Sequence, residues 1–256
     1  MTPQASGPAR KSGVFSSQPP LCIDLYCGLG GWTDGFLAEG WRVIGFDIVR
    51  PASYRGLLVL QDVATLHGSQ FRNAHMIVAS PPCQGYSYRA MPWKRAKALP
   101  PPDNTLFQAP FRIQLEASQS AGRHIPLIVE NVQGAQPWVG RAKWHHGSYY
   151  LWGDVPALMP NLRGYHVRIG AENSGAPSTE STPSSVPALQ SKNGTKILTC
   201  LAGQQHIKQP GLAGKLWFDH GAAHFGSNSP RRKEATALFS KIDFGLAEYL
   251  ARTFKP

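Results

Sequence analysis

The sequence predicts an α/β fold built on a parallel β-sheet. Two observations lead to this class. Short, almost wholly apolar runs recur between residues 20 and 153, and helical patterns or glycine-rich turns separate them. Strands that are apolar on both sides are typical of a parallel sheet whose two faces are covered by helices.

Five segments have the length and flanks of buried strands, and a short helix is expected after the first. The strands are expected at residues 21–26, 41–48, 57–63, 75–80 and 126–132. The short helix would have Thr33 or Asp34 as its N-cap and Gly40 at its end.

Further helices are expected in the middle of the chain and near its C-terminus. One lies within residues 104–121, where Pro110 would either start the helix or kink it. Ser229 and Asp243 are the expected N-caps of two last helices.

Composition divides the chain into four parts. Residues 1–19 are rich in Ser, Pro and Gly and predict a flexible basic tail, while residues 20–153 hold the predicted sheet. Residues 154–224 predict a small separate region with a flexible loop at 171–196, where no periodicity remains. Residues 225–256 are expected to return to the first domain as helices.

Length and composition exclude several classes of protein. The 256 residues are 42% hydrophobic, which suits one large globular domain and excludes a wholly disordered chain. The four cysteines have no zinc-site or CxxC spacing, so neither a metal nor a disulfide framework is expected. No apolar run approaches ~18 residues, and the N-terminal residues contain no apolar stretch. We therefore expect no membrane span, no secretory signal and a cytoplasmic protein.

The net charge suggests a polyanionic partner. Lys and Arg number 26 against 15 Asp and Glu, a net charge of +11, and nucleic acid is the simplest partner of that charge. A basic surface that only keeps the protein soluble is the alternative. One run without an acid holds Arg89, Lys94, Arg95 and Lys97, which could contact phosphates or form a solvated helix face.

Polar or reactive groups recur where the predicted strands end. They are Asp24 with the turn from Tyr26 to Gly31, then Asp47, Asp62, the Pro81–Gln84 segment and the Glu130–Asn131 pair. In an open parallel sheet, ligands bind outside the carboxyl ends of the strands. Five such groups at one edge predict a functional site there.

The first turn and Asp47 point to a cofactor that carries a nucleoside. Gly28, Gly30 and Gly31 would let backbone N–H groups approach a ligand at the start of a helix, although an ordinary tight turn needs the same residues. Asp47, 19 residues after Gly28, can bind ribose hydroxyls or cap a helix. Thr33 stands where the dinucleotide fingerprint requires glycine, which disfavours an oxidoreductase.

Two further residues predict chemistry. Cys83 follows two prolines at a strand end, and the basic residues after it would favour a thiolate, although an inert buried thiol is the alternative. Glu130 closes an apolar strand, where burial would favour its protonated form and allow it to donate a proton near neutral pH. Anchoring a loop is its alternative role.

Three segments in this order resemble motifs of the carbon-5 cytosine DNA methyltransferases. They are Asp24–Gly31 (DLYCGLGG), Pro81–Gln84 (PPCQ) and Glu130–Val132 (ENV), which resemble the first, fourth and sixth motifs. The resemblance extends from Leu21 to Trp152 and weakly from Arg231 onward. The surrounding sequence looks like the compact members that bacteriophages and prophages carry, which would place the protein in the cytoplasm of a bacterial host.

The resemblance implies a Rossmann-like class I methyltransferase sheet with a small target-recognition region and S-adenosylmethionine as the methyl donor. By motif position, Asp47 would bind the donor's ribose, Ile48 would pack on its adenine and Asp62 would contact the adenine amino group. The donor-binding set as a whole is Asp24, Tyr26, Cys27, Gly28, Leu29, Gly30, Gly31, Asp47, Ile48, Asp62, Val63 and Pro82.

The same resemblance implies roles in catalysis and DNA binding. Cys83 would add to carbon 6 of a flipped-out cytosine in double-stranded DNA, Glu130 would neutralise ring nitrogen 3, and Asn131 would hold the glutamate and the cysteine loop. Gln84 and Arg141 complete the catalytic set, with Arg141 matching the first arginine of the eighth motif. The DNA-binding set is Arg89, Lys94, Arg95, Lys97 and Lys143. A monomer suffices for this chemistry.

Two departures from the family pattern keep alternatives open. Lys143 replaces the second arginine of the eighth motif, and the segment from Ser240 to Ile242 lacks the asparagine of the tenth. These departures motivate one competing hypothesis, a DNA-binding protein that has lost catalysis. The short target-recognition region keeps a second one open, a cytosine-5 methyltransferase that acts on tRNA.

Overall fold

The computed structural model describes residues 18–51, 53–87, 98–160, 229–230, 237 and 240–256. Within them, seven strands form one sheet in the order β3-β2-β1-β4-β5-β7-β6. The strands are β1 Leu21–Leu25, β2 Arg42–Asp47, β3 Leu57–Leu60, β4 Met76–Ala79, β5 Leu127–Asn131, β6 Trp144–His146 and β7 Tyr149–Gly153. The first five strands run parallel, whereas β7 lies antiparallel between β5 and β6.

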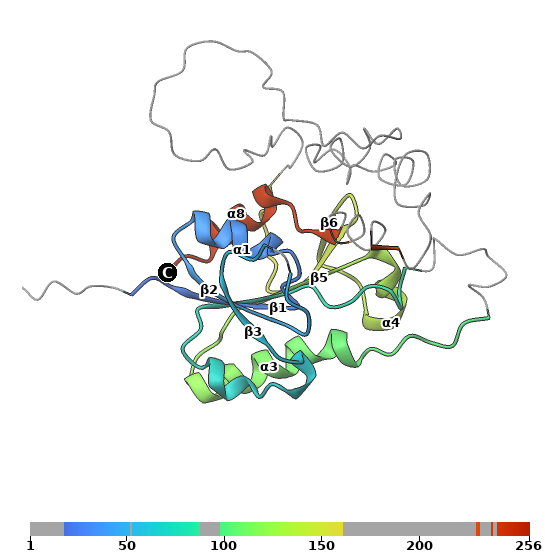
Figure 1. Ribbon diagram of the computed structural model, residues 1–256, viewed down its shortest axis with the longest axis horizontal. Coiled ribbons are helices and arrows are strands. Elements are labelled where there is room, and N and C mark those ends of the chain that lie inside the picture. Colours follow the sequence, from blue (N-terminus) through green and yellow to red (C-terminus); the bar gives the residue numbers. More distant parts are fainter. Residues whose placement is uncertain (1–17, 52, 88–97, 161–228, 231–236, 238–239) are drawn as a thin grey trace, which may run out of the picture.

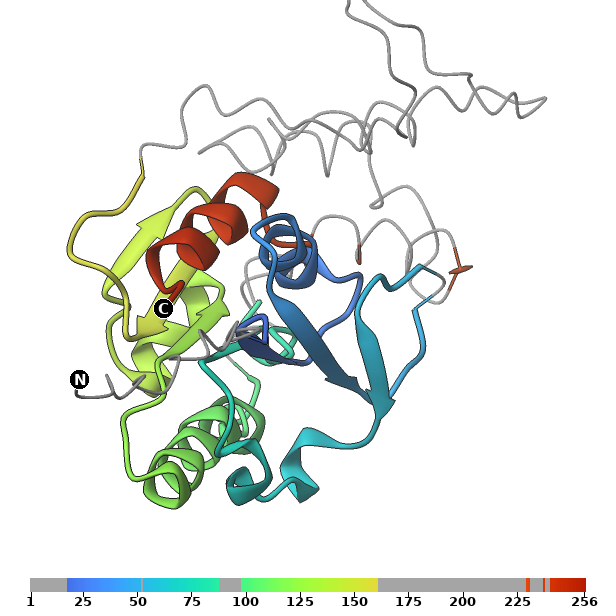
Figure 2. The same cartoon turned by 90° about the vertical axis from the view of Figure 1, so that its left-hand side faces the viewer.

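Helices cover both faces of the sheet (Figures 1 and 2). The helices α1 Gly31–Ala38 and α8 Phe244–Thr253 lie side by side on one face. The helix α3 Thr105–Ala121 covers the other face with the 3-10 turns η1 Val63–Thr65 and η2 Gly68–Phe71. After β5, the short turns η4 Gln133–Ala135 and α4 Gln136–Val139 lead into the β6–β7 hairpin.

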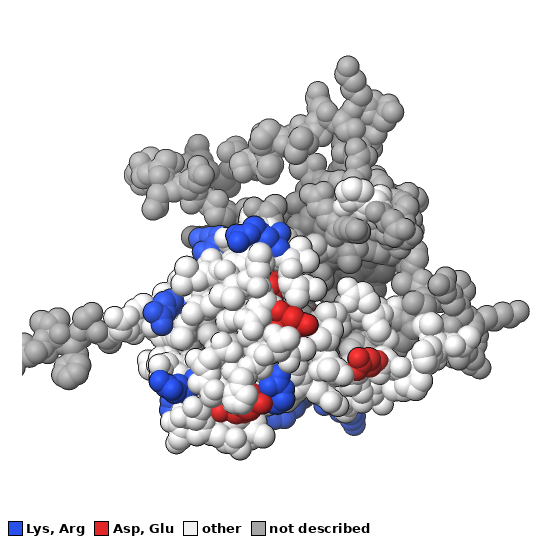
Figure 3. All heavy atoms as spheres, turned by 60° about the horizontal axis from the view of Figure 1, so that its bottom comes forward, with Lys and Arg blue, Asp and Glu red and all other residues white. Residues whose placement is uncertain are grey.

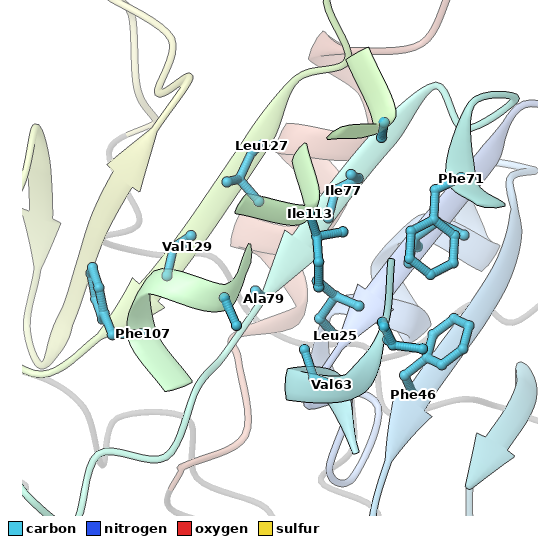
Figure 4. Packing of buried hydrophobic residues seen from close by; sticks show 14 of the residues in the cluster. Leu25, Phe46, Val63, Phe71, Ile77, Ala79, Phe107, Ile113, Leu127 and Val129 are labelled. Carbon is cyan, nitrogen blue, oxygen red and sulfur yellow. The ribbon is translucent and has the colours of Figure 1, made fainter. Parts of the chain in front are cut away.

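Each face has its own apolar core because successive strand residues point to opposite sides. On the α3 side, Leu25, Phe46, Ile77 and Val129 of the sheet pack against Ile113 of the helix (Figure 4). The second cluster joins Trp32 and Phe36 of α1 to Leu246 and Leu250 of α8, among others. Burial of each such side chain stabilises the fold by about 1.5–3 kcal/mol relative to exposure.

The expected strands are confirmed at β1, β2, β4 and β5, and the sheet departs from expectation at both of its edges. Strand β3 is shorter than the expected segment, and its residues are mostly exposed. The expectation that both faces of the sheet are covered therefore does not hold at this edge strand. The hairpin of β6 and β7 is not foreseen by the sequence pattern, and it makes the sheet mixed rather than parallel.

The expected N-cap of the first helix is wrong. Helix α1 begins at Gly31, and its N-cap is Gly30, whose φ of 72° is available to glycine without a steric cost. Thr33 therefore lies inside the helix, where its hydroxyl donates to Asp24 at 2.7 Å. Gly40, with a φ of 76°, follows the C-cap Glu39 and ends the helix as expected.

The C-terminal helix is confirmed together with its cap. The Asp243 Oδ1 atom accepts from the Leu246 N–H at 3.1 Å, which satisfies one donor of the first turn. Helix α8 then packs closely on α1, because a Cβ on Gly35 would lie only 2.5 Å from the Ala247 Cβ. Pro230 is helical directly after Ser229, and residues 231–236 of that expected helix lie outside the described residues.

The N-terminal tail, the loop at 171–196 and most of the region expected at 154–224 also lie outside the described residues.

Candidate active site

The carboxyl ends of the parallel strands lie along one edge of the sheet, and the strand order reverses at β1. Strand β1 lies between β2 and β4, so the turn after β1 and the loop after β4 lie next to each other at the switch point of the sheet. A hydrogen bond of 3.0 Å from Trp32 Nε1 to Ser80 Oγ links α1 to the end of β4. Ligands of open α/β sheets bind at such a point.

The glycine turn after β1 leaves room for a ligand and is tied to β2. Gly28 and Gly30 have φ values of 47° and 72°, and a Cβ on Gly28 would meet only the Tyr26 carbonyl oxygen, at 4.0 Å. The Asp47 carboxylate accepts from the Gly28 N–H and from the Val49 N–H, both at 3.0 Å. Each carboxylate oxygen of Asp47 can accept a second hydrogen bond, here from a hydroxyl group. The turn and Asp47 therefore fit the ribose of a nucleoside.

Asp24 lies beneath this turn with one oxygen in need of a partner. The side chain is fully buried, and its Oδ2 atom accepts from Thr33 Oγ1, whereas Oδ1 has no hydrogen-bond partner among the described residues. Burial raises the pKa of Asp24 to about 7. An unsatisfied buried acceptor costs about 1–3 kcal/mol, so Oδ1 fits a donor group on a polar ligand.

Tyr26 has an unusual backbone conformation and an unusual partner. Among the described residues it alone has a positive φ without being glycine, at 58°. Its hydroxyl donates to the Leu106 carbonyl of α3 at 2.9 Å. That carbonyl is four residues before Pro110, which lies inside α3 and has no N–H to offer it. Pro110 therefore does not start the helix, contrary to one of the two expectations. The Leu106 carbonyl that it leaves without a helix donor accepts from Tyr26 instead.

The cysteine loop after β4 is fixed by the end of β5. Asn131, which is buried, donates through Nδ2 to the Pro81 carbonyl at 3.0 Å and accepts from the Val132 N–H at 2.8 Å. Half-buried Cys83 begins a tight turn, since its carbonyl accepts from the Tyr86 N–H at 2.9 Å and the Ser87 N–H at 3.0 Å. This arrangement fixes the backbone on both sides of the thiol.

Glu130 precedes Asn131 on β5 and is buried, with 9% of its surface exposed. It pairs across the strands with Leu151 of β7, so the unforeseen hairpin shields it from solvent. A carboxyl group and a thiol therefore stand at the ends of neighbouring strands, which is an arrangement suited to nucleophilic addition with proton donation.

The remaining sites expected to bind the donor differ in exposure. Asp62 is exposed and caps η1 by accepting from the Ala64 N–H, while Ile48 is 72% exposed. The side chain of Val63 is buried in the core, so only its backbone could face a donor. Cys27 is buried, Leu29 is half-buried, and Pro82 and Gln84 are exposed in the cysteine loop.

The C-terminal segment lies against the glycine turn. A Cβ on Gly31 would lie 2.5 Å from the Ile242 backbone nitrogen, so only glycine permits this contact. Lys241 donates to Asp34 of α1 at 2.7 Å, and its carbonyl accepts from the Tyr149 hydroxyl. The structure therefore brings the segment expected to replace the tenth motif to the edge where the turn lies.

The charged residues expected to bind DNA are only partly described. Arg141 and Lys143 are exposed in the connection that leads into β6, and Arg89, Lys94, Arg95 and Lys97 lie outside the described residues. On the face in Figure 3, basic and acidic side chains are interspersed rather than gathered. The described residues hold eleven Lys and Arg and eleven Asp and Glu, a net charge of zero, so the whole excess of +11 comes from the rest of the chain.

Sequence reasoning missed the side chains that organise the site from outside the motifs. Thr33 and Tyr54 are linked to Asp24 by hydrogen bonds, and no motif marks Tyr54. One signal was available for α3: a proline inside a helical pattern frees the carbonyl four residues earlier, so a partner for Leu106 could have been sought.

None of the described helices is long and apolar enough to cross a membrane. Nor does the described part of the chain bring three or more His, Cys, Asp or Glu side chains together as metal ligands.

The order and directions of the strands are those of the Rossmann-like S-adenosylmethionine-dependent methyltransferases, which confirms the expected fold class. No protein-family model and no curated protein matches the chain. Solved structures do match it, and the chain spans only about a third of the length of the first two described next.

One similar structure is assigned as a DNA modification methyltransferase of an E. coli prophage; it is 27% identical over 45% of this chain and 33% of that chain, with a TM-score of 0.33. Another is the S. pombe Dnmt2 methyltransferase, 19% identical over 46% and 36%, with a TM-score of 0.34. A third is magnesium protoporphyrin IX methyltransferase from Synechocystis PCC 6803 with bound S-adenosylmethionine, 17% identical over 46% and 51%, with a TM-score of 0.26.

Proposed function

We propose that this protein transfers a methyl group from S-adenosylmethionine to carbon 5 of cytosine in DNA through a covalent adduct with Cys83. One observation carries the proposal: Asn131 fixes the Pro81–Cys83 loop beside Glu130, at the same sheet edge as the glycine turn. The matched motifs of the sequence support the same reaction.

The donor would supply an electrophilic methyl group on a sulfonium sulfur. The residues of this edge fit its other parts. Asp47 and the N–H groups of the glycine turn suit the ribose, and the unpartnered Asp24 Oδ1 suits a hydrogen-bond donor on the amino-acid moiety. Ile48 and Asp62 are the side chains proposed for the adenine.

Cys83 would act as the nucleophile. Its thiolate forms a bond to carbon 6 of the cytosine ring, which makes carbon 5 nucleophilic enough to take the methyl group as the bond from the donor's sulfur to that methyl breaks. A base then removes the carbon-5 proton, the bond from sulfur to carbon 6 breaks, and the thiolate is regenerated.

Glu130 would stabilise the charge that the addition places on ring nitrogen 3, by donating or sharing a proton there. The burial of Glu130 on β5, where it pairs with Leu151 of β7, supports this role because it keeps bulk water from competing for the same proton. Asn131 would act as a positioning residue, since its amide holds the Pro81 carbonyl and so the loop that carries Cys83.

The target cytosine must leave the duplex before Cys83 can reach it, which costs a few kcal/mol. Arg141 and Lys143 are exposed next to the β6–β7 hairpin, where they could contact the flipped nucleotide or its phosphates. The four basic residues that follow the cysteine loop in sequence are proposed to bind the DNA backbone.

Bisulfite sequencing tests this function. The protein is expressed in a host that lacks cytosine methylation, and its plasmid is compared with plasmid from cells that express Cys83→Ala at the same level. We expect cytosines protected in one recurring sequence context with the wild type and none with the variant. Unprotected DNA together with transfer of tritiated methyl to tRNA would contradict the proposal, as would equal protection by the variant.

A further inference from the structure

Tyr54, which lies between β2 and β3 and in none of the matched motifs, packs on three glycines at the candidate site. A Cβ on Gly30 would lie 3.2 Å from the Tyr54 ring, and one on Gly56 would lie 3.0 Å from it. A Cβ on Gly45 would collide with the Tyr54 hydroxyl itself. Because Gly45 pairs with Asp24 across β2 and β1, the missing side chain lets the hydroxyl reach the position beside Asp24.

The Tyr54 hydroxyl belongs to a hydrogen-bonded chain that leads to Asp24, and the Cys27 thiol is a further partner of the same hydroxyl. The Tyr54 hydroxyl lies 2.7 Å from Thr33 Oγ1, which in turn donates to Asp24 Oδ2 at 2.7 Å. Thr33 has a single hydroxyl hydrogen, so when that hydrogen is given to Asp24, Tyr54 must be the donor to Thr33. Burial raises the pKa of the Tyr54 hydroxyl, which keeps its proton in place for this role.

Such a chain fixes the carboxylate as well as stabilising it. Both Thr33 and Asp24 are fully buried, and hydrogen bonds in series strengthen one another in such surroundings. The chain engages Oδ2, while Oδ1 is the buried side-chain atom left without a partner in the described part of the molecule.

We propose that Tyr54 is a positioning residue for the methyl-donor site: through Thr33 it holds the Asp24 carboxylate so that Oδ1 stays available to a hydrogen-bond donor on the ligand. This inference rests on the proposed function. It assigns to the site a residue that the motifs do not contain.

Donor affinity is then expected to depend on pH through Asp24. The titratable groups that face Asp24 are Asp47 at the end of β2, Asp34 on α1, the Cys22 and Cys27 thiols, and Tyr54 itself. Both carboxylates disfavour ionisation of Asp24, and the Thr33 hydroxyl favours it. Loss of the Tyr54 hydroxyl weakens Thr33 as a donor, so the ionised form would appear at higher pH.

Isothermal titration calorimetry with S-adenosylhomocysteine between pH 5.5 and 8.5 tests the proposal. It compares the full-length wild type with Tyr54→Phe, and Tyr249→Phe serves as the matched control, because the Tyr249 hydroxyl donates to the Leu158 carbonyl instead. We expect Tyr54→Phe to bind S-adenosylhomocysteine about three- to tenfold more weakly than the wild type at pH 7. The pH at which the affinity reaches half of its maximum, the pH midpoint, should be higher for this variant. The control is expected to follow the wild type.

Two Thr33 variants separate positioning from packing. Thr33→Ser keeps the hydroxyl and should keep the wild-type midpoint, whereas Thr33→Val should shift it as Tyr54→Phe does. Circular dichroism confirms that each variant is folded at the titration temperature. A Tyr54→Phe profile equal to that of the wild type would overturn the role of Tyr54 alone. Absence of binding by the wild type at every pH would overturn the methyltransferase function, and this inference with it.

Discussion

At the scale of the single residue, Asp24 is the least ordinary group of the site. It is a carboxyl group with no exposed surface, and the carboxylates of Asp47 and Asp34 lie close enough to oppose its ionisation. Desolvation is the largest cause of its raised pKa, and the Thr33 hydrogen bond offsets only part of it. A buried carboxyl group with a raised pKa at a ligand-binding edge is typical of a functional site.

The stability of the protein is therefore expected to depend on the protonation of Asp24. Because its pKa is about 7 in the folded state and about 4 in the unfolded chain, the folded state holds the proton longer. The stability that Asp24 contributes is fully present below about pH 4 and is lost as the pH rises toward 7. Above that pH the free energy of unfolding no longer changes through Asp24. Asp24→Asn cannot ionise and should lack this loss.

Urea unfolding measured from pH 5 to pH 7.5 checks this prediction. Over that interval Asp24→Asn should gain roughly 1–3 kcal/mol of stability relative to the wild type. Curves that stay parallel across the whole interval would show that the folded protein does not perturb Asp24.

At the scale of the element, α3 and the glycine turn are joined by a proline. Pro110 has no N–H, so the Leu106 carbonyl cannot accept the usual helix hydrogen bond from residue 110. The Tyr26 hydroxyl donates to this carbonyl instead, at 2.9 Å. The contact spans 80 residues of sequence and connects the turn after β1 to the helix on the opposite face of the sheet. The residue that makes this contact, Tyr26, has a left-handed backbone conformation.

A double-mutant cycle is expected to detect this connection. Tyr26→Phe should destabilise the wild type by about 1 kcal/mol, because a helix carbonyl loses its donor. In a Pro110→Ala background the restored N–H can satisfy Leu106, so the same change should cost little. Denaturation of the four proteins should give a coupling energy of about 1 kcal/mol. Equal costs in both backgrounds would contradict the role of Pro110.

The contact between α1 and α8 yields a second prediction at this scale. Gly→Ala inside a helix normally stabilises it by about 1 kcal/mol. At Gly35 the added Cβ would lie 2.5 Å from both the Ala247 Cβ and the Glu248 backbone nitrogen, so α8 must move. We expect Gly35→Ala to lower stability by about 1–3 kcal/mol, measured by thermal or urea unfolding. Unchanged or increased stability would show that the helices can separate without cost.

At the scale of the whole molecule, charge is divided unequally. The described residues are neutral, and the entire excess of +11 belongs to the remainder, of which Arg89, Lys94, Arg95 and Lys97 supply four charges. A polyanion would then be attracted by those segments and not by the sheet domain as a whole.

The salt dependence of DNA binding checks this division. Arg89→Gln/Lys94→Gln is compared with Arg42→Gln/Arg72→Gln, which removes two exposed charges from the neutral part. The first variant should bind DNA more weakly, and the slope of log K against log salt should become shallower by about 0.9 for each phosphate that the variant no longer neutralises. The second should follow the wild type. Equal effects of the two variants would mean that DNA binding is not confined to the basic segments.

Much of the fold could be predicted because it depends on local patterns. The apolar runs predicted β1, β2, β4 and β5, and the Asp243 cap marked the start of α8. The β6–β7 hairpin was missed because its strands carry Trp, His and Tyr side chains rather than an apolar run, and its pairing with β5 is decided by tertiary contacts. Thr33 was misplaced because a helix that starts on a left-handed glycine needs no side-chain cap.

The sequence by itself determined the class of fold and the residues that could react, since strand periodicity, glycine turns and the order of the motifs are properties of the chain. Only the tertiary structure decided what surrounds them. Tyr54 lies beside Asp24 because Gly45 has no side chain, Tyr26 reaches α3 because Pro110 has no N–H, and Ile242 touches the turn because residue 31 is glycine. Each contact depends on a group that a residue lacks, the Cβ of glycine or the N–H of proline. A local sequence pattern cannot predict which distant residue will occupy the space or donate to the freed carbonyl.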